Sequence, residues 1–156
     1  MEFCILFELL LLAIMLYLPR EKSSVYCWIA AYLVFGLFVT LFNIVFVGKL
    51  DKALPPTASI ERSLLLFIIN AAEIVVAFAI FYRHASGYSA DEAFFNSLLV
   101  FGTIGYPAQG NHYIVASQIA LDFVFLAIFL SAFVGRLSAF NRMSEASQAN
   151  GRLKSE

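Results

Sequence analysis

Two sets of residues in this 156-residue chain have types and spacings that could do chemistry. The acids Glu73 and Asp122 each lie inside an apolar run, where a carboxylate can bind a cation or relay a proton. The second set follows the apolar stretch Ala93–Phe101, where glycine and proline recur at Gly102, Gly105, Pro107 and Gly110. Such backbone is irregular, and its carbonyl oxygens are then available to a ligand.

The composition is that of a membrane protein. Hydrophobic residues make up 62% of the chain and charged residues 13%, and the mean hydropathy is +0.84. Soluble domains have roughly 45–50% apolar and about 25% charged residues, and a chain this short has too little interior to bury the excess. The formal net charge of −1 gives no basic field for nucleic acid. We therefore exclude a soluble enzyme, a disordered chain and a nucleic-acid binder.

Four apolar runs are candidate membrane spans. The second has about 23 residues, which at about 1.5 Å per residue crosses a hydrocarbon core of about 30 Å. The first carries Glu8 and no small-residue cleavage site, which indicates a retained helix rather than a signal peptide. The four runs are Phe3–Leu18, Val25–Val47, Ser63–Tyr82 and Tyr113–Val134.

A shorter apolar segment lies between the third and fourth runs. Ser89, followed by Asp91 and Glu92, predicts a helix start, because such side chains accept the free amide hydrogens of a first turn. The helix continues over Ala93–Phe101 and ends in the glycine-rich backbone. A half-length helix that runs into irregular backbone predicts a re-entrant hairpin, because such backbone is tolerated in a membrane only where it is buried in protein or lines water.

The distribution of Lys and Arg orients the four spans. The two ends of the chain and the connector 48–62 carry seven of these residues, and the opposite side carries three. The positive-inside rule therefore places both termini in the cytoplasm of a multi-pass protein of the cell (inner) membrane, with the hairpin entering from outside.

The hairpin resembles the pore of a known family. Thr103-Ile104-Gly105-Tyr106 is similar to the Thr-x-Gly-Tyr-Gly selectivity filter of potassium channels. Ala93–Ser97 is similar to the pore helix of these channels. The fourth run, with Asp122 and then Gly135-Arg136-Leu137, is similar to the inner helix of the small bacterial two-helix-pore family. The resemblance covers about residues 62–137.

The resemblance implies a homotetramer whose filter binds potassium through backbone carbonyls of Thr103, Ile104, Gly105 and Tyr106. Rings of carbonyl oxygens replace the water shell of the ion. The chain would then be neither an enzyme nor the carrier of a cofactor. Its partners would be the lipid bilayer and a permeant monovalent cation, and Asp122, with Glu73 behind the pore helix, would tune the pore.

The sequence departs from the family at Pro107, which stands where the motif has its last glycine. Proline fixes φ near −65°, so the outermost carbonyl ring cannot take the usual left-handed geometry. This change bears on discrimination between potassium and sodium. The first two runs lack the regularly spaced arginines of a voltage sensor.

The sequence thus predicts an all-α membrane protein with four transmembrane helices and a re-entrant pore helix and filter loop between the third and fourth. Residues 1–61 would form two helices and a cytoplasmic connector, 62–137 the pore domain, and 138–156 a polar, loosely ordered cytoplasmic tail. Three alternatives stay open: a weakly selective pore, a non-conducting membrane module, and a proton-coupled carrier that uses Glu73 and Asp122 as a relay.

Overall fold

The chain is helical throughout the parts that the structure describes. The computed structural model covers residues 2–18, 23–46, 60–105, 107 and 111–153, and every regular element within these ranges is an α-helix. The prediction of an all-α protein is confirmed. The helices are α1 (Glu2–Tyr17), α2 (Ser23–Phe46), α3 (Ile60–Ser86), α4 (Ala90–Phe101) and α5 (His112–Leu153).

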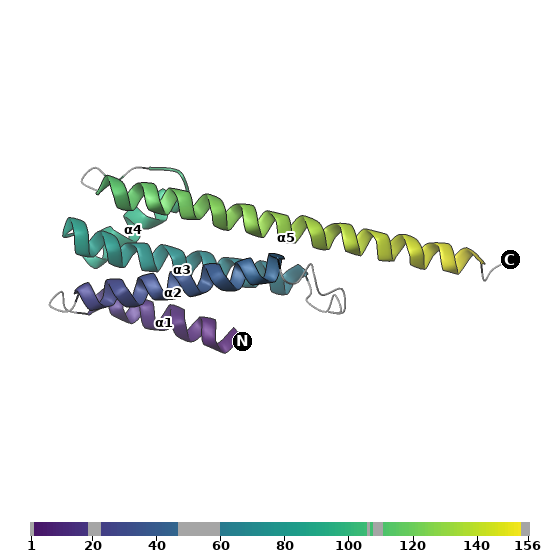
Figure 1. Cartoon of the computed structure of the whole chain (residues 1–156), viewed down its shortest axis with the longest axis horizontal. Helices are drawn as coiled ribbons and strands as arrows, with labels where there is room; N and C mark the ends of the chain where they lie inside the picture. The colour runs from purple at the N-terminus through teal and green to yellow at the C-terminus, as the bar shows by residue number, and fades with distance from the viewer. Residues whose placement is uncertain (1, 19–22, 47–59, 106, 108–110, 154–156) are drawn as a thin grey trace.

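Helix α3 occupies the centre of the bundle. It packs against each of the other four helices (Figure 1), and α5 in turn contacts both α2 and α4. Its residues 73–80 are all buried, which is typical of a helix with neighbours around its whole circumference. In this arrangement α1 runs parallel to α3, and α5 runs antiparallel to it (Figure 1).

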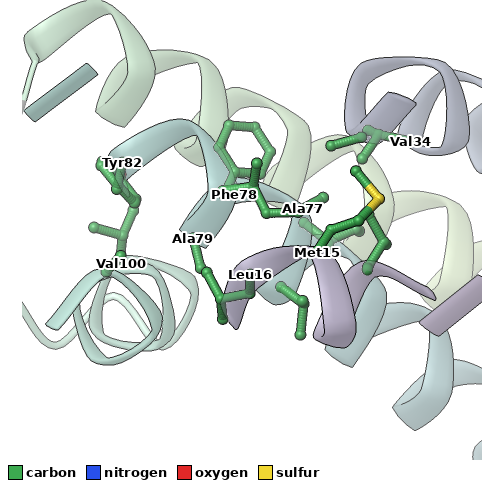
Figure 2. Packing of buried hydrophobic residues seen from close by; sticks show 14 of the residues in the cluster. Met15, Leu16, Val34, Ala77, Phe78, Ala79, Tyr82 and Val100 are labelled. Atoms are coloured by element: carbon green, nitrogen blue, oxygen red, sulfur yellow. The ribbon is translucent and has the colours of Figure 1, made fainter. Parts of the chain in front are cut away.

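The core draws buried side chains from all five helices. Figure 2 shows side chains from α1, α2, α3 and α4 that pack together. Small residues on α3 let its backbone come close to its neighbours, since a side chain of one carbon takes little room. The labelled members are Met15, Leu16, Val34, Ala77, Phe78, Ala79, Tyr82 and Val100.

Two helices are long and apolar enough to cross a membrane. They are the segments Leu64–Ser86 of α3 and His112–Gly135 of α5, among the residues that the structure describes. The apolar parts of α1 and α2, Ile5–Tyr17 and Ser24–Thr40, are shorter. The predicted runs therefore correspond to helices, while a topology of four spans remains a prediction.

The start of α4 agrees with its prediction. Ser89 is the N-cap residue, and its hydroxyl accepts a hydrogen bond from the amide of Glu92 at 3.3 Å. The carboxylate of Glu92 in turn accepts a hydrogen bond from the amide of Ser89 at 3.0 Å, which completes a capping box. The preceding turn contains Gly87 at φ +72°, in the left-handed region that favours glycine after a helix end.

Ser89→Ala is expected to lower the free energy of unfolding by about 1 kcal/mol, the usual value of an N-cap hydroxyl. Thermal or denaturant unfolding in detergent measures this loss. The matched control is Ser117→Ala on exposed α5, where the hydroxyl only donates to carbonyls of its own helix. Equal stability of the Ser89 variant and the wild type would contradict the prediction.

The expected loose tail is corrected by the structure, because α5 continues to Leu153. Its 42 residues extend about 63 Å, well past the ends of the other helices (Figure 1). No proline follows Pro107, and alanine, glutamate, glutamine and arginine beyond Gly135 all favour a helix.

One end of the bundle is tied by long-range hydrogen bonds. The Arg83 guanidinium at the end of α3 donates to the carbonyl of Leu16 and, at 2.8 Å, to that of Leu18, where α1 ends. The Tyr17 hydroxyl donates to a carboxylate oxygen of Asp91 in the first turn of α4 at 3.0 Å. These bonds fix α1 to both helices that position the site.

Candidate functional site

Helix α4 is held between α3 and α5 by buried hydrogen bonds. The Ser97 hydroxyl donates to the carbonyl of Val75 on α3 at 2.7 Å. From α5, the Gln118 side-chain nitrogen donates to the carbonyl of Ser97 at 2.9 Å and to its hydroxyl at 3.1 Å. Ser97 and Gln118 are both fully buried. A buried, hydrogen-bonded polar side chain sets one register for the helices that it joins, since any shift leaves it unpaired.

The C-terminal end of α4 closes with a Schellman motif. The amide of Thr103 donates to the carbonyl of Val100 at 2.9 Å, and the amide of Ile104 donates to that of Leu99 at 2.9 Å. This pattern requires a left-handed residue after the cap, and Thr103 takes that position with φ 55°. A β-branched residue is rare there, because its side chain crowds the backbone.

The segment after α4 is exposed on the surface of the subunit. Thr103, Ile104 and Gly105 are all exposed, and 79% of Ile104 is accessible. Within the described parts of the chain, no backbone amide donates to the carbonyls of these three residues. The arrangement presents three consecutive carbonyl groups at the end of a half-length helix. Tyr106 lies outside the described residues, and Pro107 is buried.

Thr103→Gly is expected to raise the free energy of unfolding by about 0.5–1 kcal/mol. Glycine removes a left-handed strain of about 1–2 kcal/mol, and the gain is reduced by the greater freedom of glycine in the unfolded chain. Unfolding in detergent measures the change. The matched control is Thr40→Gly within helix α2, which should destabilise. Destabilisation by Thr103→Gly would show that the strain is absent.

The predicted acids occupy different parts of the interior. Asp122 is 4% exposed and lies on the face of α5 that also carries Val115, Gln118 and Phe125, all buried. Glu73 on α3 is equally buried, and the acid that acts on it electrostatically is Glu8 of α1. No charged group of the described residues acts in this way on Asp122. The structure thus places Glu73 with α1, and Asp122 with the Ser97–Gln118 pair.

The number of residues along α1 and α3 also places Glu73 near Glu8. Arg83 reaches the carbonyl of Leu18 at one end of the parallel pair α1 and α3. Ten residues earlier, about 15 Å back along each axis, stand Glu8 and Glu73. The sequence analysis used Glu8 only as a sign of a retained helix and did not pair it with Glu73, because an interaction between residues 65 positions apart leaves no local signal.

The exposed face of α5 carries small residues at alternating steps of three and four. In the described part of this helix the face comprises four small residues, Ser117, Ala120, Ala127 and Ser131, and the larger Val124, all exposed. Asp122 lies about 160° around the helix from Ala120 and Val124. Small residues at such spacing allow helices to approach closely in lipid. The stripe is therefore suited to helix packing, and Asp122 points away from it.

No family model, curated protein sequence or solved structure matches this chain. The site is therefore defined by its own geometry.

Several residues of the site carried a signal that the sequence reading did not use. Ser97 is one of two polar residues inside the apolar part of α4, and Gln118 precedes Asp122 by four residues, which puts both on one helix face. Asn111 caps α5, because its side-chain oxygen accepts a hydrogen bond from the amide of Tyr113 at 3.0 Å. Arg83 was counted among the three basic residues on the outer side of the membrane, and its hydrogen bonds to α1 were not predicted.

Proposed function

We propose that four copies of this chain form a pore that passes potassium passively across the cell membrane, without a voltage sensor. The observation that carries the proposal is the exposed segment Thr103–Gly105 at the end of α4. Its carbonyl groups have no amide partner within the described chain, and stacked carbonyl rings are what a dehydrated potassium ion requires. One chain supplies one such strand, so a closed ring requires several copies.

The length and the packing of α4 favour a role as a pore helix. With 12 residues, about 18 Å, the helix is too short to cross a bilayer, and it packs between α3 and α5, the two helices that can. The C-terminal end of a helix has a partial negative charge, which favours cations near the exposed segment. The strained conformation of Thr103 is of the kind that accumulates at functional sites.

The proposed membrane arrangement has four spans, with α1 and α2 as the first two and both termini in the cytoplasm. The small-residue stripe of α5 supports contact between copies, since close helix packing in lipid favours small side chains. Carbonyls of Thr103, Ile104, Gly105 and Tyr106 would bind the ion. Asp122 and Glu73 would affect the pore from inside the subunit rather than by contact with the ion.

The test is a flux assay on the purified protein in liposomes of phosphatidylcholine and phosphatidylglycerol. We expect potassium efflux that barium or a quaternary ammonium ion blocks, and particles of four-fold symmetry in detergent. Pro107→Gly should increase the preference for potassium over sodium, because glycine restores the left-handed geometry at the outermost ring. Equal permeability of both ions would remove selectivity from the proposal but leave the pore. Absence of flux together with monomeric or dimeric particles would contradict it.

A further inference from the structure

The hydrogen bonds around Ser97 leave three buried oxygens without a donor. They are the side-chain oxygen of Gln118 and both carboxyl oxygens of Asp122, none of which has a hydrogen-bond partner among the described residues. Gln118 is fully buried and Asp122 is 4% exposed. A buried acceptor without a donor costs about 1–3 kcal/mol. The buried groups around Ser97 therefore have more hydrogen-bond acceptors than donors.

The orientation of the Gln118 amide is fixed by its partner. The backbone carbonyl of Ser97 can only accept a hydrogen bond, so the nitrogen of Gln118 must face it. The oxygen of Gln118 then points to the other side. Asp122 lies four residues further on the same face of α5, a spacing at which glutamine and aspartate side chains reach each other.

The chain of hydrogen bonds has one direction. Gln118 donates to Ser97, and the Ser97 hydroxyl donates to the carbonyl of Val75. An ionised Asp122 would add two further acceptors one helical turn from Gln118, with no donor to them among the described residues. A protonated Asp122 would supply the missing donor to the side-chain oxygen of Gln118 and continue the series from α5 through α4 to α3.

The surroundings of Asp122 give no charge that would compensate a carboxylate. Among the described residues, no group on the elements packed nearby donates a hydrogen bond to either carboxyl oxygen of Asp122. The titratable groups that the structure describes on those elements are Glu73, Tyr82, Arg83 and His84 of α3, Asp91 and Glu92 of α4, His112 and Tyr113 of α5, and Tyr26, Cys27 and Tyr32 of α2. An ionised acid without a partner is costly at membrane depth.

We propose that Asp122 is a proton-binding site whose neutral carboxyl group donates to the side-chain oxygen of Gln118. The bound proton then completes the connection that holds α4 between α3 and α5, and Asp122 acts as a positioning residue for α4. The proposal rests on the buried groups around Asp122 and not on ion flux, so it holds whether or not the protein conducts ions.

Infrared spectroscopy of the full chain in detergent tests the proton directly. At neutral pH we expect the carbonyl band of protonated carboxylic acids. The Asp122→Asn variant should lose the contribution of Asp122 to this band. Glu73→Gln is the matched control: it changes another buried acid but should leave that contribution in place. Gln118→Leu should shift the same contribution to higher frequency, because the hydrogen bond is lost. An unchanged protonated-acid band in Asp122→Asn would overturn the proposal.

A pH series of thermal unfolding gives an independent readout. The folded state would bind one more proton than the unfolded state, so the unfolding temperature of the wild type should fall by several degrees as pH rises from mildly acidic to alkaline. Asparagine donates at every pH, so Asp122→Asn should keep its stability at neutral pH and lose this part of the slope. The Glu73→Gln variant should retain the part of the pH dependence that Asp122 causes. An Asp122→Asn protein with the full wild-type slope would refute the bound proton, even if ion flux were normal.

Discussion

Gly105→Ala is expected to lower potassium flux in reconstituted liposomes by about tenfold or more, since about 1.4 kcal/mol added to a barrier has that effect. In a ring of four copies, the change puts four methyl groups next to the carbonyls that would bind the ion. The subunit itself can accept the methyl group. A Cβ atom at Gly105 would lie 3.5 Å from the nearest atoms of the Leu99 side chain, an ordinary contact.

Because the subunit has space for the added methyl group, a loss of flux in Gly105→Ala can be distinguished from a loss of folding. The unfolding temperature of Gly105→Ala should equal that of the wild type, while its flux should not. Gly36→Ala on α2 is the matched control, because nothing lies within 4 Å of the added atom, and it should conduct normally. Wild-type flux in Gly105→Ala, from tetramers of normal stability, would remove this segment from the ion path.

Arg83→Met is expected to lower the free energy of unfolding by about 2–3 kcal/mol, as for other hydrogen bonds to a charged group. The guanidinium donates to the carbonyls of Leu16 and Leu18, which have no partner within α1 after its last turn. A cation at a helix C-terminus is also favoured by the helix dipole. Methionine keeps much of the side-chain length but supplies no donor. Denaturant unfolding and proteolysis of α1 measure the effect.

Arg83→Lys tests whether charge or shape matters. Lysine retains the charge near the end of α1 but lacks the planar fork that reaches two carbonyls. We expect it to recover part of the loss of Arg83→Met. If the Lys variant is no more stable than the Met variant, the whole effect comes from the planar guanidinium group and not from its charge. Wild-type stability of both variants would show that α1 is held by its apolar contacts alone.

Local patterns in the sequence predicted the helices and the start of α4. The apolar runs correspond to α1, α2, α3 and the first part of α5, and the Ser89 cap with Glu92 was readable because all of its partners lie within four residues. The end of α4 near Phe101 was likewise readable from the glycines that follow.

Features that depend on contacts between distant residues were not predicted. Arg83 binds carbonyls about 65 residues away, and Glu73 lies near Glu8 at the same separation. The left-handed Thr103 follows from the closing hydrogen bonds of α4, which override the preference of a β-branched residue. The length of α5 was missed because polar residues of good helix propensity were taken as disordered.

The uninterrupted α5 has a mechanical consequence. The helix is continuous and contains no proline, so a displacement applied near Leu153 would be transmitted along it toward the turn that carries Gln118. The same helix contacts α4 at Ser97. A macromolecule bound at the C-terminal end of α5 would thus act mechanically on α4 from several nanometres away.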